Sequence, residues 1–377
     1  MKLNEICEVY SGYALKAFND AEDGLPVIKI GNILTDGTLN LEECQYTTDS
    51  VNEKYYSQRG DIYIALSGAT TGKIGIMDAG EKYVINQRVG IVRQKSDDVP
   101  QEYIKYFLLR QTNRILQEAA GCAQPNISPK QIAEYVIPDT SQEKMQEICE
   151  VLDRIKKIID SRKAEMSALD DLIKARFVEM FGDVQHEEKY KGIQLGELCT
   201  TMSGGTPSTK FPEYYEGDIP WISTVSLGPN YIDGTTAKGY ITQEAVDNSA
   251  TKLIPAGNIL FGTRVGVGKS SLNNVDICTN QDIVAIVGID ESKFNRLFIK
   301  HVLDAYQSYY DSIKKGATIL GITGDDLKDT LIPNAPIEIQ IEFEKFVNQV
   351  DKSKVAVQKA LDETQLLFNS LMQKYFG

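Results

Sequence analysis

The second half of this 377-residue chain repeats the first half at an offset of about 195 residues. Three clear matches are Pro26-Val27-Ile28 with Pro220-Trp221-Ile222, Asn86-Gln87 with Asn280-Gln281, and Ile137-Pro138 with Ile332-Pro333. Further matches in the same order are Ser11-Gly12 with Ser203-Gly204, Gly60-Asp61 with Gly257-Asn258, Gly72-Lys73 with Gly268-Lys269, Tyr103-Ile104-Lys105 with Phe298-Ile299-Lys300, and Phe181-Gly182 with Phe376-Gly377. A repeat of this length predicts two copies of one architecture.

The first part of each half is predicted to be a globule that mixes strands and helices. Short β-like runs separated by Gly, Pro, Asn and Asp occur at 27–30, 61–66, 89–93, 258–261 and 283–287. A helical stretch follows in each copy, at 102–118 and 294–314. The pattern predicts an α+β class, with two repeated mixed α/β domains.

The second part of each half is predicted to be one long helix. Residues 142–181 and 337–376 contain neither proline nor glycine. Thr140 and Glu143 have the spacing of a capping box before the first helix, and Gly182 follows it. Apolar residues recur every three or four positions at Met145, Ile148, Leu152, Ile155, Ile159, Met166, Leu169, Ile173 and Met180, with Arg162 and Arg176 as interruptions, and at Phe343, Phe346, Val350, Val357, Leu367 and Leu371.

A helix of this kind would extend roughly 60 Å at about 1.5 Å per residue and needs a partner to cover its apolar stripe. We expect the two helices to pair as an antiparallel coiled coil, which relates the globules by a pseudo-twofold axis. The alternative is that each helix packs only on its own globule. The predicted domains are therefore 1–140, the helix 141–182, the second globule 183–336 and the helix 337–377.

Composition places the chain among globular proteins of a reducing compartment. Its six cysteines are far apart and form no Cys-x-x-Cys pair (Cys7, Cys44, Cys122, Cys149, Cys199 and Cys278). No apolar run approaches the roughly 20 residues that span a bilayer, and the start of the sequence has no signal-peptide pattern. We expect a cytoplasmic protein.

The net charge of -13 argues against a protein that binds nucleic acid through bulk electrostatics. Residues 1–140 hold 14 Lys and Arg against 19 Asp and Glu, and residues 186–333 hold 13 against 18. If DNA is bound, local basic loops or a partner protein must supply the phosphate contacts.

Catalytic patterns are not evident in the sequence. The segment Gly262–Ser270 resembles a phosphate-binding loop, but Thr263 stands where that motif needs glycine. The two histidines, His186 and His301, have no metal-ligand spacing. These patterns favour a binding module over an enzyme.

Taken together, the repeat, the two globules and the two helical stretches resemble the specificity subunit of type I restriction–modification systems. The second globule carries the phrases of that family most closely, in Ser203–Ser208, Gly217–Ser223, Ile259–Lys269 and Asn280-Gln281. In the first globule Ala65-Leu66-Ser67-Gly68 and Thr71-Gly72-Lys73 replace the turn that contains arginine.

The resemblance implies a non-catalytic DNA-recognition subunit in which each globule reads one half of a split double-stranded DNA site. It also implies that the helices set the spacing between the halves and dock two methyltransferase subunits, with motor-nuclease restriction subunits completing the assembly. S-adenosylmethionine, ATP and Mg²⁺ would then belong to those partners, and this chain would need no cofactor or metal.

Candidate DNA-binding residues are polar side chains on the turns between strands, since such groups on rigid turns read base edges. They are Ser67, Thr70, Thr71, Lys73, Gln87 and Arg88 in the first globule and Thr263, Arg264, Lys269 and Gln281 in the second. Each could instead hold the turn together, and Asn86-Gln87 and Asn280-Gln281 could be structural because both halves contain them. Two rival functions remain open: a coiled-coil scaffold without DNA specificity, and an enzyme that binds a nucleotide at the glycine-rich turns.

Overall fold

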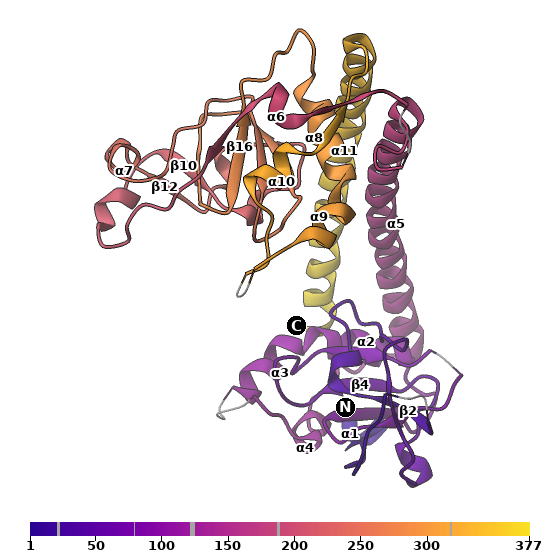
Figure 1. Cartoon of the computed structure of the whole chain (residues 1–377). Helices are drawn as coiled ribbons and strands as arrows, with labels where there is room; N and C mark the ends of the chain where they lie inside the picture. Colours follow the sequence, from indigo (N-terminus) through magenta and orange to yellow (C-terminus); the bar gives the residue numbers. More distant parts are fainter. Residues whose placement is uncertain (21–22, 79, 121–124, 187–188, 317–318) are drawn as a thin grey trace. The chain divides into compact units, whose positions relative to one another are not determined.

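The structure is a computed structural model that describes residues 1–20, 23–78, 80–120, 125–186, 189–316 and 319–377 (Figure 1). The chain divides into two compact units: unit 1 is Met1–Lys163 with Gln358–Gly377, and unit 2 is Ala164–Val357. Each unit contains one globule and a part of each long helix. Of the six cysteines, the five that the structure describes are unpaired, and Cys122 lies outside the described residues.

Unit 1 is built on two small sheets. The larger has the order β1 (Cys7–Ser11), β7 (Val89–Gln94), β4 (Ile62–Ala65), β5 (Ile74–Ile76), with every neighbouring pair antiparallel. The smaller has the order β3 (Gln45–Thr47), β2 (Leu25–Ile28), β6 (Val84–Ile85), and β2 is parallel to β6. Strand β4 is buried along its whole length, because alternate residues enter different apolar clusters: Ile62 and Ile64 one, Tyr63 and Ala65 the other.

Unit 2 repeats this topology. Its larger sheet has the order β9 (Thr200–Ser203), β16 (Ile283–Val287), β13 (Ile259–Gly262), β14 (Ser270–Asn273), with β11 (Tyr231–Ile232) added at the edge. Its smaller sheet has the order β12 (Gly239–Ile241), β10 (Ile219–Ile222), β15 (Cys278–Thr279), again with one parallel pair, β10 with β15. Strands β8 (Gly192–Gln194) and β17 (Leu331–Pro333) form a further pair.

The shorter helices also correspond between the units. The pairs are α1 (Leu3–Ile6) with α6 (Leu195–Leu198), α2 (Gln101–Arg110) with α8 (Arg296–Ala305), α3 (Thr112–Ala119) with α9 (Gln307–Ile313), and α4 (Pro129–Ala133) with α10 (Gly324–Lys328), while unit 2 adds α7 (Gln243–Asp247). Single 3-10 turns occupy Ile30–Asn32, Glu53–Tyr55, Pro212–Tyr215, Thr224–Ser226 and Gly234–Thr236.

Two expected single helices are each broken into two. The stretch 102–118 is divided between α2 and α3, and 294–314 between α8 and α9. At the first break the hydroxyl of Thr112 donates to the carbonyl of Leu109 at 3.0 Å, a local bond that competes with the helical pattern. The strands expected at 61–66, 89–93, 258–261 and 283–287 are present as β4, β7, β13 and β16. The strand expected at 27–30 overlaps β2 only at residues 27 and 28, because a 3-10 turn begins at Ile30.

The long helices are α5 (Gln142–Phe181) and α11 (Ile337–Phe376), each of 40 residues. In unit 1 the start of α5, through Met145 and Leu152, shares a core with Met372 and Phe376 at the end of α11. In unit 2 the end of α5, through Phe177 and Phe181, packs with Phe343 at the start of α11. The helices therefore pair in antiparallel directions within each unit, which confirms the expected pairing.

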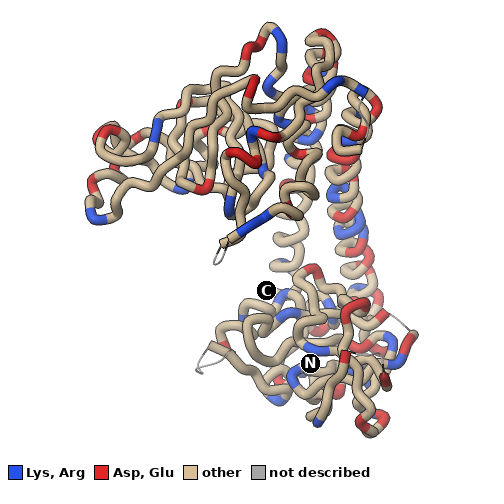
Figure 2. The backbone as a smooth tube through the Cα atoms, viewed as in Figure 1, with Lys and Arg blue, Asp and Glu red and all other residues tan. Residues whose placement is uncertain are grey.

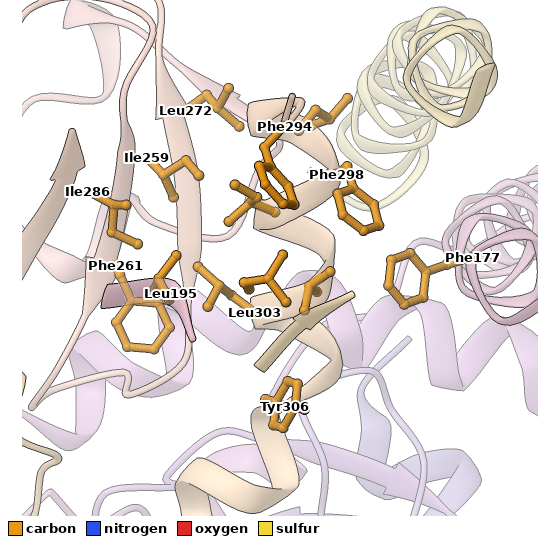
Figure 3. Packing of buried hydrophobic residues seen from close by; sticks show 14 of the residues in the cluster. Phe177, Leu195, Ile259, Phe261, Leu272, Ile286, Phe294, Phe298, Leu303 and Tyr306 are labelled. Atoms are coloured by element: carbon orange, nitrogen blue, oxygen red, sulfur yellow. The ribbon is translucent and has the colours of Figure 1, made fainter. Parts of the chain in front are cut away.

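These helix segments also belong to the cores of the globules. In Figure 3 Phe177 faces Phe298 of α8, and the opposite side of α8 faces the sheet residues Ile259, Phe261 and Ile286, which belong to the same apolar cluster. The two expected modes of packing thus occur together in unit 2. Figure 2 shows acidic and basic residues interspersed along α5. Besides the apolar seam, two ion pairs join α5 to α11 in unit 2, Arg176 with Glu342 at 2.9 Å and Lys354 with Asp170 at 2.6 Å.

Two details of the helix prediction are wrong. The cap of α5 is Ser141 and not Thr140, because the Ser141 hydroxyl accepts from the amide of Lys144 at 3.3 Å. Leu367 is 51% exposed and lies outside the seam, since Thr364, Phe368 and Leu371 take the inward positions at that end of α11. Gly182 ends α5 as expected, with a φ of 81° that favours glycine.

No helix in the described residues is long and apolar enough to cross a membrane.

Candidate nucleic-acid interface

Two turns meet at the same edge of the larger sheet in each unit. The hairpin turn follows the central strand and comprises residues 66–73 between β4 and β5, or residues 263–269 between β13 and β14. The Asn-Gln turn precedes the next strand and comprises residues 86–88 before β7, or residues 280–282 before β16. Because β4 pairs with β7 and β13 pairs with β16, the two turns lie side by side in both units.

Equivalent backbone bonds join the two turns. In unit 1 the amide of Leu66 donates to the carbonyl of Arg88 at 2.9 Å, and in unit 2 the amide of Thr263 donates to the carbonyl of Asp282 at 2.8 Å. These bonds align Leu66 with Thr263 and Arg88 with Asp282. The residue that follows Leu66, Ser67, therefore occupies the place of Arg264.

The hairpin turn closes in the same way in both units. The amide of Gly72 donates to the carbonyl of Ala65 at 2.9 Å, and that of Gly268 donates to the carbonyl of Gly262 at 3.0 Å. Gly72 and Gly268 have φ values of 82° and 86°, a conformation that L side chains rarely adopt. The lysines that follow, Lys73 and Lys269, occupy equivalent places, because their carbonyls accept from the amides of Ala65 and Gly262, both at 2.9 Å.

The Asn-Gln turn ties the larger sheet to the smaller one. The amides of Asn86 and Asn280 both donate at 3.0 Å, to the carbonyls of Ile28 and Ile222 respectively. Asn86 is buried, and its side-chain oxygen accepts from the amide of Arg88 at 3.2 Å. These contacts favour the structural interpretation of the two asparagines.

The predicted site residues differ in exposure. Exposed side chains belong to Gln87, Arg88, Arg264, Lys269 and Gln281, while Ser67, Thr70 and Lys73 are half-buried. Ser67 forms a β-bridge with Asn126, and the carbonyl of Thr70 accepts from the amide of Lys73 at 3.0 Å. The structure thus brings these residues together on two adjacent turns in each unit.

Thr71 and Thr263 are buried, with hydroxyls used inside the fold. Thr71 donates to the carbonyl of Gly68 at 2.6 Å, and Thr263 donates to the carbonyl of Asp282 at 3.1 Å. A hydroxyl in this position holds the turn. We leave both threonines out of the candidate surface.

Arg264 is held by the Asn-Gln turn of unit 2. Its Nε lies 3.1 Å from an Asp282 carboxylate oxygen, and its Nη2 donates to the carbonyl of Gln281 at 3.3 Å. The Gln281 side chain in turn accepts a hydrogen bond from the hydroxyl of Thr206. The Arg264 side chain remains 45% exposed, whereas that of Asp282 is only 14% exposed.

Asp282 and Thr206 were not among the predicted site residues, although Thr206 lies in the segment Ser203–Ser208 that carries the family resemblance. Asp282 directly follows Gln281 in the sequence. It was not predicted as a site residue because the prediction considered cationic, amide and hydroxyl side chains, and Asp282 is a carboxylate. The adjacency of Asp282 to Arg264 depends on the pairing of β13 with β16, which joins positions far apart in the chain.

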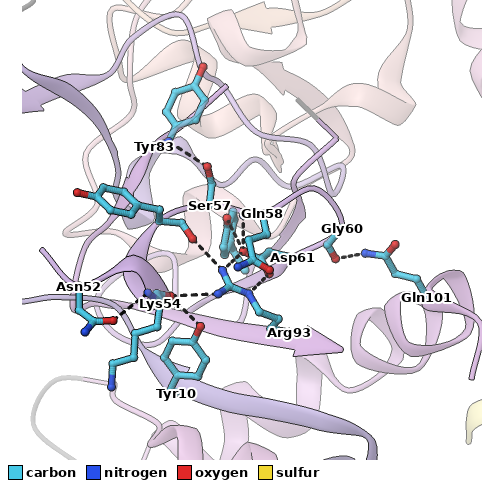
Figure 4. Close-up of polar contacts among 12 residues, drawn as sticks. Tyr10, Asn52, Lys54, Ser57, Gln58, Gly60, Asp61, Tyr83, Arg93 and Gln101 are labelled. Carbon is cyan, nitrogen blue, oxygen red and sulfur yellow. Dashed lines mark hydrogen bonds and ion pairs between the residues drawn. The ribbon is translucent and has the colours of Figure 1, made fainter. Parts of the chain in front are cut away.

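Among the described residues, no three His, Cys, Asp or Glu side chains form a group that could hold a metal ion. In unit 1 a buried ion pair away from the two turns stabilises the fold. Asp61, almost fully buried, pairs with Arg93 at 2.6 Å beside the hydrogen bonds of Ser57 and Tyr83 (Figure 4).

Comparison with known proteins gives consistent matches. The model of the type I restriction modification DNA specificity domain matches residues 1–169 and again residues 187–364. The MjaIX specificity subunit of Methanocaldococcus jannaschii is 30% identical over 42% of this chain and 37% of its own length. Two Escherichia coli specificity subunits, of the EcoR124I/EcoR124II and EcoBI type I enzymes, are 28% and 21% identical over 57% and 100% of this chain and 53% and 85% of their own lengths. This chain therefore spans about half or less of the first two relatives.

Solved structures agree in fold. A chain from a structure concerned with complex assembly and conformational transition of the type I R-M system has a TM-score of 0.60 and 17% identity, covering 100% of this chain and 96% of that one. The S subunit of the type I system from M. genitalium has a TM-score of 0.55 and 14% identity, covering 100% and 95%. The matched family model accounts for most of the sequence in two copies, and the chain belongs to the family of type I restriction–modification specificity subunits.

Proposed function

We propose that this chain recognises a two-part sequence in double-stranded DNA, with residues 1–140 reading one part and residues 183–336 reading the other. The observation that carries the proposal is the recurrence of the paired turns at the same sheet edge in both units. Two globules with the same fold but different side chains on these turns suit a DNA site made of two different half-sequences. Base edges in the major groove are read by side chains of the types found here.

A partner is needed to complete the DNA contact. The chain has a net charge of -13, and each globule presents only a few cations at its turns. DNA affinity depends mainly on neutralising phosphates. We propose that two methyltransferase subunits supply those contacts and that restriction subunits join the assembly, while this chain is non-catalytic, carries no cofactor and acts in the cytoplasm.

The outer faces of the long helices provide surfaces for such partners. Val151, Ile158 and Leu172 on α5 follow heptad spacing and are 39%, 48% and 47% exposed. On α11, Val355 and Leu366 are each 71% exposed. Exposed apolar side chains at this spacing support docking of partner helices.

Unit 1 also has a groove. It has a volume of about 1020 Å³ and lies among the loop 35–39, α2, the first part of α5 and the last part of α11. Leu109, Ile159 and Phe368 line it, together with charged side chains of both signs: Lys105, Arg110, Lys156, Lys163, Asp36, Asp78 and Asp160. We propose that a segment of the methyltransferase subunit with apolar side chains and charges of both signs binds here, and that the two helices also set the spacing between the half-sites.

The test is an exchange of residues 1–140 for the corresponding domain of a relative with a known DNA site. Mapping of methylated adenines in cells should then find one half of the site changed and the other half unchanged. A change of both halves, or methylation without sequence preference in the parent protein, would contradict the proposal. A control exchange of residues 183–336 should change only the other half.

A further inference from the structure

The two copies of the paired turns share some side chains and differ in others. Position by position, Lys73 corresponds to Lys269 and Gln87 corresponds to Gln281. In contrast, Ser67 corresponds to Arg264 and Arg88 corresponds to Asp282. Each globule thus presents one arginine at this edge, but from opposite turns.

The shared and the differing side chains suit two different kinds of DNA contact. Phosphates are the same along any sequence, so two readers can bind them with the same residues. Base edges differ, so readers of different half-sites need different residues at the contacting positions. The shared Lys73 and Lys269 suit phosphate, and the exchanged Arg88 and Arg264 suit bases.

The geometry of Arg264 adds a specific contact. Its Nε and Nη2 form one edge of the guanidinium, and this edge faces Asp282 and the carbonyl of Gln281. The opposite edge, formed by Nη1 and the second hydrogen of Nη2, has no hydrogen-bond acceptor among the described residues. An arginine held in this way presents two parallel donors, the arrangement that matches N7 and O6 of guanine.

We propose that Arg264 reads a guanine in the second half-site, that Asp282 is the positioning residue that orients it, and that Arg88 reads a guanine in the first half-site. This inference rests on the proposed DNA recognition. Arg88 is exposed, and its guanidinium forms no ion pair within the described part of the chain. No carboxylate therefore orients Arg88 as Asp282 orients Arg264. We expect Arg88 to discriminate less strongly between guanine and the other bases.

The experiment uses the full chain in complex with its methyltransferase subunits and DNA carrying its methylation site. Each guanine of the second half-site is replaced in turn by 7-deazaguanine, which lacks N7 but keeps base pairing. The wild-type complex should lose affinity by about tenfold at one guanine. The Arg264→Ala complex should bind the natural site about tenfold more weakly and should no longer respond to the replacement at that guanine.

Four further variants test the positioning residue, the two parallel donors, a matched control and the first half-site. Asp282→Asn should lose part of the discrimination at the same guanine while binding the other replaced sites as the wild type does. Arg264→Lys keeps the charge without the two parallel donors and should not restore discrimination. Lys252→Ala, at an exposed cation of unit 2 outside both turns, is the matched control and should behave as wild type. Arg88→Ala should give the corresponding result in the first half-site.

Failure of the inference is distinguishable from failure of the proposed function. Equal weakening of Arg264→Ala on every DNA, with the 7-deazaguanine penalty retained, would mean a phosphate contact and would overturn the inference. A second half-site without guanine would also overturn it. Absence of any sequence preference in the wild-type complex would instead overturn the proposed DNA recognition.

Discussion

Asp61 and its counterpart Asn258 use one position of the repeat in two ways. In unit 1 the Asp61 carboxylate forms an ion pair with Arg93 at 2.6 Å and accepts a hydrogen bond from the amide of Gln58 at 2.9 Å. In unit 2 the Asn258 side chain donates to the carbonyl of Pro255 at 2.9 Å. A buried charge in the first globule is thus replaced by a neutral amide in the second, which needs no cation beside it.

Replacement of Asp61 by Asn should destabilise unit 1 by about 3 kcal/mol, because it leaves a mostly buried guanidinium without its counter-charge. Asp61 and Arg93 have side chains that are 1% and 14% exposed. Urea unfolding followed by circular dichroism measures the change. The matched control is Glu134→Gln in the pair with Lys2, where both side chains are at least half exposed and the loss of stability should be much smaller. Equal losses in both variants would contradict the prediction.

His301 should make unit 2 sensitive to acid. Burial, helped by nearby Lys300 and Lys354, lowers the pKa of His301 well below its usual value of 6.5. The carboxylate of Asp304 lies 3.8 Å from the ring but is already paired with Lys300 at 2.6 Å. The unfolded chain therefore binds a proton that the folded unit excludes, and stability is full above about pH 6.5 and falls as the pH drops below it.

The measurement compares urea midpoints of wild type and His301→Leu at about pH 7.5 and about pH 5.5. The wild type should lose more stability than the variant between these values, by up to about 1.4 kcal/mol per pH unit. Parallel losses in the two proteins would mean that other groups cause the acid sensitivity.

At the scale of elements, the sequence predicted the strands and the long helices because their signal is periodic and local. The turns were harder. Thr71 and Arg264 are both polar residues of a glycine-rich turn, yet one is buried and the other exposed. The hydroxyl of Thr71 lies 3.4 Å from the carbonyl of Pro125, 54 residues away, and such contacts are set by the assembled fold. For the same reason, Asp282 could not be placed beside Arg264 from the sequence.

The helix seam of unit 2 should depend on its aromatic cluster. Phe343 is fully buried, with ring centroids of Phe177 and Phe181 each 5.5 Å away. Phe343→Ala should lower the free energy of unfolding by about 3–5 kcal/mol, since a cavity remains. Val355→Ala on the same helix removes a 71% exposed side chain and should have little effect. A small effect of Phe343→Ala on thermal unfolding would count against this packing.

The outer face of the helices should serve binding and not stability. Ile158→Glu places a charge on an exposed apolar position of α5 and should leave the unfolding midpoint unchanged. Co-purification with the methyltransferase subunit should fall by at least about tenfold if a desolvated contact is lost. The control is Lys157→Glu, at an exposed neighbouring position. Unimpaired co-purification of Ile158→Glu would remove this face from the docking surface.

For the whole molecule, the acidic balance predicts cooperation with a basic partner. The chain alone should bind DNA weakly and with little sequence preference, because its net charge is -13. With methyltransferase subunits bound, affinity should rise strongly and fall steeply with added salt. Fluorescence anisotropy over a salt series measures both. Tight specific binding by the chain alone at physiological salt would contradict this prediction.

Each long helix contributes residues to both units, and this affects the order in which the parts of each unit are synthesised. Unit 1 contains residues 1–163 but also Gln358–Gly377, whose Met372 and Phe376 enter its core. On the ribosome, the first globule is synthesised early, but these residues of its core are added only after every residue of unit 2 has been synthesised. A stop codon after Val357 would therefore damage the body that was translated first and leave the later one with all its parts.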